Sequence, residues 1–97
     1  MKPMKSFNSA LPFETYLNRK AVKYYESLDD KTAKRINKAI KLISNNPFYG
    51  THIKRLIGGL EGKYRYKVGD LRIVYSVNKD KGLVFIEAIG PRGDIYK

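Results

Sequence analysis

The stretch KYRYKVGDLRIVYSV, residues 63–77, alternates apolar and polar residues on both sides of a Gly-Asp pair. Alternation of this kind predicts two half-buried β-strands, and glycine in the first loop position is typical of a tight hairpin turn. We take Gly69 and Asp70 as the two loop residues. A two-residue turn fixes which residues pair, so Lys67 is expected to face Arg72 across the hairpin.

The two faces of this hairpin differ in chemistry. The first is apolar and aromatic, and we expect it to pack against the core: Tyr64, Tyr66, Val68, Leu71, Ile73, Tyr75 and Val77. The second carries Lys63, Arg65, Lys67 and Arg72, with Val74 and Ser76 and no acidic residue interleaved on that face. Facing cations destabilise a strand pair by roughly 0.2–1 kcal/mol. A solvated sheet face usually mixes its charges, so this face indicates an anion-binding surface.

The rest of the chain supplies the other elements. Alternation over residues 12–17 predicts a short strand, and helical spacing over 19–28 and 31–46 predicts an antiparallel helical hairpin. A short extended piece is possible at 53–57, and 83–89 is typical of a further strand. The order β-α-α-β-β-β predicts an α+β fold, in which an N-terminal strand and a helical hairpin pack on an antiparallel sheet.

The length of 97 residues favours one domain. We expect residues 1–11 to be a flexible extension, because they lack periodicity, and residues 12–97 to form the domain. Asn18 is a suitable N-cap for the first helix, and Asp29 and Asp30 can end it and cap the second.

Composition narrows the partners. The formal net charge is +11, which favours nucleic acid first, an acidic protein second and a membrane surface only weakly. The chain has no cysteine and one histidine, His52, so we expect neither a metal site nor a cofactor. His52 is interpreted as a loop residue. No run is long enough to span a membrane and the start does not read as a secretory signal, so we expect a soluble cytoplasmic protein.

The residue types of the cationic face suit phosphodiester chemistry. Arginine binds phosphate through paired N–H donors and stabilises developing negative charge. A lysine crowded by arginines is a better proton acceptor than an isolated one, because like charge disfavours its protonated form. Tyrosine can stack on a base or transfer a proton. Arg92 and Tyr96, near the end of the chain, can fold over the same face.

Several motifs resemble one known family. The runs KRLIGGLEGKYRYKV and GDLRIVYSV, followed by a hydrophobic strand and PRGDIYK, resemble the RelE toxins of the RelE/ParE toxin–antitoxin superfamily. The resemblance covers about Pro12 to Lys97. It implies a RelE-like fold and a metal-independent endoribonuclease, an mRNA interferase that cleaves mRNA in the ribosomal A site by attack of the 2′-hydroxyl on the adjacent phosphate. It also implies translation inhibition, relieved by a RelB-like antitoxin in a hetero-oligomeric complex.

The resemblance assigns roles to individual residues. Arg72 and Arg92 would hold and stabilise the phosphate, and Tyr96 would orient or stack the substrate. Lys67 would be the base or a charge partner, supported by Arg65, which cannot deprotonate. The base is therefore Lys67 or Tyr96. Further cations are expected to contact RNA or the ribosome: Lys63, Lys54, Arg55, Lys34, Lys38 and Lys41.

Two other functions stay open. ParE-like relatives share the fold and poison DNA gyrase, although the set Arg72, Arg92 and Tyr96 suits RNA cleavage better. The third interpretation is a non-catalytic basic nucleic-acid-binding domain or an inactive relative, which would bind RNA with strong salt dependence and show no toxicity.

Overall fold

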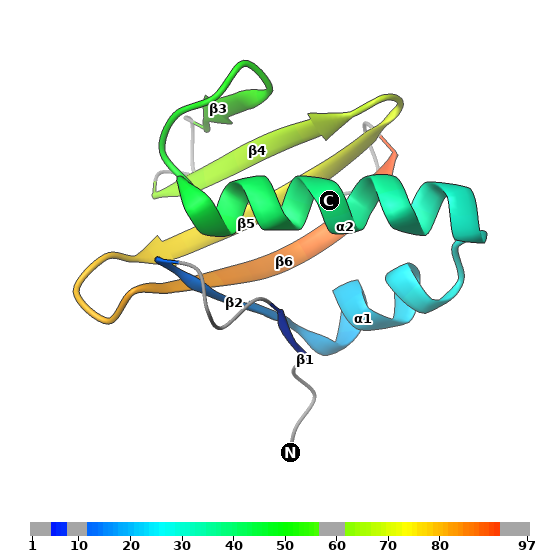
Figure 1. The fold of residues 1–97 in the computed structure, drawn as a ribbon, viewed down its shortest axis with the longest axis horizontal. Coiled ribbons are helices and arrows are strands. Elements are labelled where there is room, and N and C mark those ends of the chain that lie inside the picture. Colours follow the sequence, from blue (N-terminus) through cyan, green and yellow to red (C-terminus); the bar gives the residue numbers. More distant parts are fainter. Residues whose placement is uncertain (1–4, 8–11, 57–61, 92–97) are drawn as a thin grey trace.

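The computed structural model describes residues 5–7, 12–56 and 62–91. In this part of the chain two helices pack on one six-stranded sheet with the strand order β1-β2-β6-β5-β4-β3 (Figure 1). The strands are β1 Lys5–Phe7, β2 Glu14–Leu17, β3 Ile53–Arg55, β4 Lys63–Val68, β5 Leu71–Asn78 and β6 Leu83–Pro91; the helices are α1 Arg19–Glu26 and α2 Asp30–Asn45. The expected α+β class is confirmed.

The chain path explains the pairing directions. After β2, the two helices carry the chain to the far edge of the sheet at β3 (Figure 1). It then returns through three successive antiparallel pairings, from β3 to β6. The last of these strands therefore lies beside β2 and parallel to it. The sheet is antiparallel as expected apart from this one pair, which no local sequence pattern indicates.

Strand β1 departs from the sequence-based expectation. Residues 1–11 were expected to be flexible, but Lys5–Phe7 pair antiparallel with β2, with Ser6 opposite Tyr16. The expectation is wrong for these three residues, and the others of the segment lie outside the described residues. The backbone groups on the outer edge of β2 need partners, and β1 supplies them. Three residues are too few for alternation to reveal such a strand.

The hairpin register is the predicted one. Val68 pairs with Leu71 and Lys67 with Arg72. Gly69 has a φ of 58°, the left-handed conformation that glycine adopts at no steric cost in such turns. The predicted inner face is confirmed, because Tyr66, Ile73 and Tyr75 are buried and the other four residues pack partly buried against the same core.

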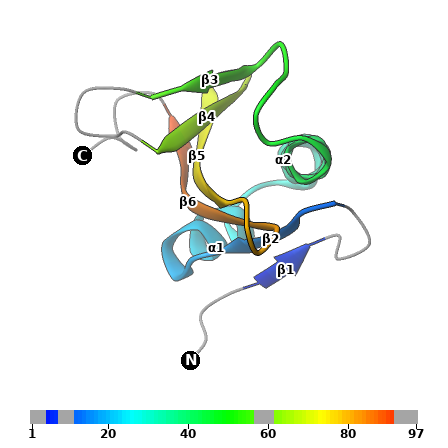
Figure 2. The ribbon, with the colours of Figure 1, turned by 90° about the vertical axis from the view of Figure 1, so that its left-hand side faces the viewer.

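Both helices contribute to this core. The helix predicted from the spacing over 31–46 is confirmed as α2, in which Ile36, Ile40 and Ile43 form a completely buried stripe. Helix α2 lies against one side of β4 and β5, as Figure 2 shows. Asn18 caps α1 as expected, because its side-chain oxygen accepts a hydrogen bond from the Ala21 amide at 2.8 Å. The Asn18 side-chain amide also donates to the backbone carbonyl of Glu87 at 2.8 Å, which fixes the start of α1 on β6.

A buried tyrosine anchors the loop that follows α2. The Tyr75 hydroxyl donates to the carbonyl oxygen of Pro47 at 2.7 Å, and both residues are completely buried. Burial, with a smaller contribution from Tyr64 and Tyr66, raises the pKa of Tyr75 well above its ordinary value. Burial also raises the pKa of Tyr66. The native state therefore keeps the Tyr75 hydroxyl neutral and available as a donor.

Replacing Tyr75 by phenylalanine tests this anchor. Tyr75→Phe keeps the ring but leaves the buried Pro47 carbonyl without its donor, so we expect a loss of about 1–3 kcal/mol in the free energy of unfolding. Urea denaturation measures it. Tyr49→Phe is the matched control, because Tyr49 is 80% exposed and should change stability by less than about 0.5 kcal/mol. An unchanged unfolding midpoint for Tyr75→Phe would show that the hydroxyl contributes nothing.

The raised pKa of Tyr75 also predicts a pH dependence. The unfolded tyrosine ionises near pH 10, whereas the folded one stays neutral to higher pH. Deprotonation therefore favours the unfolded state, and this contribution to stability is present below about pH 10 and lost above it. We expect the wild-type protein to lose stability more steeply than Tyr75→Phe as the pH rises above this value. An equal decrease in the free energy of unfolding with pH for the wild-type protein and Tyr75→Phe would contradict the prediction.

Candidate nucleic-acid interface

Several cations gather on the side of the sheet opposite to α2. Lys54 on β3 pairs with Arg65 on β4, and Lys67 on β4 pairs with Arg72 on β5. Because successive strand residues alternate between faces, these four side chains leave the face that packs against α2. We call Lys54, Arg65, Lys67 and Arg72 the outer cationic face. The structure thus brings together three of the predicted catalytic residues: Arg65, Lys67 and Arg72.

The surroundings of the Lys67–Arg72 pair leave it accessible to an anion. Lys67 is exposed, whereas Arg65 and Arg72 are partly buried. On β6 the residue opposite Arg72 is Gly90, which brings no side chain to this face. No described carboxylate forms an ion pair with Lys67 or Arg72. An arginine held in a sheet next to a mobile lysine can bind a phosphate group between the two.

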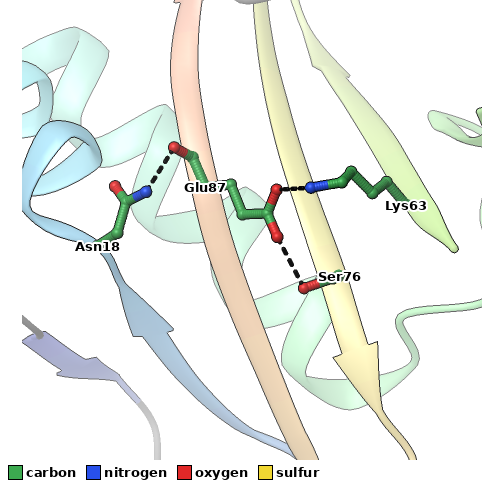
Figure 3. Close-up of polar contacts among 4 residues, drawn as sticks. All are labelled: Asn18, Lys63, Ser76 and Glu87. Carbon is green, nitrogen blue, oxygen red and sulfur yellow. Dashed lines mark hydrogen bonds and ion pairs between the residues drawn. The ribbon is translucent and has the colours of Figure 1, made fainter. Parts of the chain in front are cut away.

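One acidic residue does reach the outer side of the sheet, from a strand outside the hairpin. The pairing of β5 with β6 shifts between Val74 and Tyr75, so that Glu87 is an extra residue in β6. Its carboxylate accepts a hydrogen bond from the Ser76 hydroxyl at 3.0 Å and forms an ion pair with Lys63 (Figure 3). Lys63 is therefore neutralised, whereas no carboxylate of the described residues forms an ion pair with Lys67. The first cation of the hairpin, Lys63, is thus paired with an acidic residue that the sequence of the hairpin alone did not reveal.

The β-bulge at Glu87 was missed from the sequence. Its signal is the spacing of Ile86 and Ile89, which are both buried although they lie three residues apart. A regular strand would place such residues on opposite faces, so a buried pair at this spacing requires an extra residue between them.

The remaining predicted RNA contacts lie elsewhere. Arg55 pairs with Tyr64 and so lies on the other side of the sheet from Lys54. Lys34, Lys38 and Lys41 are exposed on α2. The predicted cations therefore occupy both sides of the molecule rather than one surface. Arg92 and Tyr96 lie outside the described residues, and their place in the site stays a prediction.

A groove lies between α2 and the end of β4 that leads into the hairpin turn. Its cationic rim includes Arg35 and Lys38 of α2 together with Lys67, it has a volume of about 440 Å³, and His52 lies in its wall. The His52 and Tyr66 rings approach to 5.6 Å between centroids. Arg35 packs so closely on the turn that a Cβ atom on Gly69 would come within 2.5 Å of its guanidinium. The sequence alone did not bring these residues together.

Comparison with known proteins identifies the family. A family model for the ParE toxin of the type II toxin–antitoxin system parDE matches residues 16–96. The chain belongs to this toxin family. The resemblance to RelE-type toxins is also confirmed, since solved members of the RelE/ParE superfamily share the fold. No curated protein matches the chain.

Three solved structures illustrate the likeness. The RelE–RelB complex of the archaeon Pyrococcus horikoshii is 26% identical, with a TM-score of 0.68 over 80% of this chain and 92% of that one. A heterotetrameric YoeB–YefM complex from Staphylococcus aureus is 26% identical, with a TM-score of 0.65 over 78% and 92%. The YoeB/ParE toxin from Agrobacterium tumefaciens has a TM-score of 0.73 over 80% and 96% at 19% identity, which shows the fold alone.

The described residues were also compared with what a metal site and a membrane-spanning helix require. Among residues 5–7, 12–56 and 62–91, no group of three or more His, Cys, Asp or Glu side chains is arranged to hold a metal ion. Neither helix in these ranges is long and apolar enough to cross a membrane.

The ion pair of Glu87 can be tested with single-stranded RNA as a polyanionic probe of the outer side of the sheet. Glu87→Gln can keep the hydrogen bond with Ser76 but releases Lys63, so one more cation can contact phosphate. We expect tighter binding of single-stranded RNA and a slope of log K against log salt that is steeper by about 0.7. Fluorescence anisotropy across a salt series measures both.

The control for this variant carries the same change in charge. Glu26→Gln also removes one negative charge, at an exposed position on α1, and should leave the slope unchanged. Equal slopes for the two variants would show that Glu87 does not mask a phosphate-binding cation.

Proposed function

We propose that this toxin is a ribosome-dependent endoribonuclease of the RelE type, acting in the cytoplasm on mRNA in the ribosomal A site. The observation that carries the proposal is the Lys67–Arg72 pair, whose like charges face each other on an accessible sheet face beside Arg65. A phosphate bound between the two side chains relieves their repulsion. A broken local rule of this kind is typical of a functional site.

The proposed chemistry assigns one role to each side chain. The guanidinium of Arg72 holds the phosphate and stabilises the charge that develops on its oxygens, with Arg92 as a second cation. Lys67 or Tyr96 accepts the proton of the 2′-hydroxyl, whose oxygen forms a bond to phosphorus while the bond to the 5′-oxygen breaks and that oxygen takes up a proton from water. The products are a cyclic phosphate and a 5′-hydroxyl. Arg65 adds positive charge but cannot take the proton.

The shape of the outer cationic face supports the dependence on the ribosome. Its described residues project from a sheet surface, and Lys67 is exposed to solvent. Such a face binds phosphate but does not by itself hold a 2′-hydroxyl in line with the phosphorus. Correct alignment contributes much of the acceleration in reactions of this kind. We therefore assign the alignment of the mRNA to the ribosome.

A RelB-like antitoxin is the proposed protein partner. Solved relatives are complexes of RelE with RelB and of YoeB with YefM. With a net charge of +11, the toxin attracts a segment rich in carboxylates. An acidic segment over the outer cationic face would exclude phosphate from Lys67 and Arg72 and so silence the toxin, in a complex of toxin and antitoxin chains.

Gyrase poisoning is the second candidate function. It is favoured by the family model, which is that of the ParE toxin. In this case the outer cationic face would be dispensable for toxicity, because no RNA phosphate has to be bound there.

In vitro translation of a defined mRNA separates the two candidates. We expect cuts within A-site codons, mapped by primer extension, only when ribosomes are present. Arg72→Ala should lower the cleavage rate by about 100-fold or more, the usual effect of removing a group that stabilises developing charge. Lys67→Ala and Arg92→Ala should also abolish toxicity without unfolding the protein.

The control is Lys23→Ala, which removes an exposed cation from the last turn of α1 and should cleave like the wild-type toxin. Intact mRNA with and without ribosomes would reject the nuclease, and a gyrase supercoiling assay would then test the second candidate. Cleavage of free RNA would reject the ribosome dependence.

A further inference from the structure

A second pocket lies away from the outer cationic face. It has a volume of about 360 Å³ and is lined by Phe48, Tyr49, Arg55, Tyr64 and Lys79. These residues come from the loop after α2, from β3 and β4 and from the turn that follows β5. Tyr64 and Lys67 are about 10 Å apart along β4 and point to opposite faces of the sheet. The pocket is therefore separate from the proposed catalytic residues.

The most unusual member of this pocket is Tyr49. Its side chain is 80% exposed, although large aromatic residues in a small protein normally contribute to the core. An exposed aromatic ring gains little for the fold. On the surface of a loop, such a ring is typical of a binding residue.

The loop that carries Tyr49 is held at the peptide group that joins Pro47 to Phe48. Pro47 is completely buried, and its carbonyl accepts the hydrogen bond from Tyr75. The amide of Phe48 donates to the side-chain oxygen of Asn46 at 3.1 Å. The loop therefore presents Tyr49 from an ordered backbone, which lowers the entropy lost when a ligand binds.

The floor of the pocket continues this ordered arrangement. The Phe48 ring makes edge contacts with Phe13 and Tyr64, at 5.9 and 5.7 Å between centroids. Tyr64 in turn stacks on Tyr75 at 5.6 Å. A chain of aromatic contacts thus links the pocket to the core, and the pocket combines a rigid aromatic wall with the exposed ring of Tyr49.

The charges of the pocket define its ligand. Arg55 and Lys79 are exposed, and no carboxylate is among the described residues that line the pocket. Aromatic faces beside cations are the combination that binds single-stranded RNA, where a base stacks on a ring and the phosphate contacts arginine or lysine. An acidic peptide would use the cations but not the flat faces of the rings. We propose that this pocket binds one nucleotide of single-stranded RNA, with the base against Tyr49 and the phosphate on Arg55 and Lys79.

This inference goes beyond the proposed function and does not depend on it, because the pocket needs no cleavage chemistry. The toxin would therefore still bind RNA at this pocket when Lys67 and Arg72 are replaced by alanine.

The absence of tryptophan from the chain gives a direct test. Tyr49→Trp places one tryptophan in the proposed stacking position, at an exposed site that tolerates the change. A short single-stranded RNA oligomer should quench its fluorescence in a saturable way, because the base contacts the indole ring. A duplex of the same sequence should not. Adding Arg55→Ala or Lys79→Ala to this variant should weaken the quenching by about five- to tenfold.

Fluorescence anisotropy of labelled oligomer supplies the second measurement. Tyr49→Ala should weaken binding of the single strand by about tenfold, the usual cost of losing one base–aromatic stack. Lys23→Ala, an exposed cation on α1, should change it by less than about twofold. RNA binding without any change in the emission of Tyr49→Trp would overturn the proposal. Equal quenching by polyglutamate would also overturn it and would make the pocket a site for an acidic protein.

Discussion

The two-residue turn at Gly69 and Asp70 is the constraint on which the candidate interface depends. It fixes the register of β4 against β5, and a slip by one residue would exchange the buried and exposed faces of β4. Gly69 meets the requirement of this turn, because its φ of 58° lies in the left-handed region that glycine adopts without steric cost. The aromatic core face and the outer cationic face thus follow from one turn.

On the outer side of the sheet, the net positive charge increases along β4 from Lys63 to Lys67. The bulge in β6 turns Glu87 toward Lys63 and Ser76, so one end of β4 is neutralised (Figure 3). At the other end Lys67 faces Arg72 with no described carboxylate in an ion pair with either. The unfavourable electrostatic energy is therefore concentrated where the proposed function places the phosphate. A bulge next to a functional site is a common way to redirect one side chain.

The buried tyrosines connect stability with the second pocket. Tyr75 holds the carbonyl of Pro47 and stacks on Tyr64, so the same contacts stabilise the core and order the loop that presents Tyr49. The sequence predicts that Pro47 ends the helix. It does not predict that a tyrosine of β5 donates a hydrogen bond to the Pro47 carbonyl. Contacts between residues so distant in the chain depend on how α2 packs on the sheet.

The sequence by itself determined the hairpin, its register, the amphipathic stripe of α2 and the N-cap of α1, because each rests on local spacing or on the conformation of one turn. It also determined that Lys67 faces Arg72. Only the tertiary structure decided that β2 and β6 run parallel, that Lys5–Phe7 add an edge strand, that Glu87 neutralises Lys63, and that Tyr49 and Lys79 share a pocket. The physical reason is that these features join segments that local periodicity does not relate, so they arise only when the helices and the sheet close around one core.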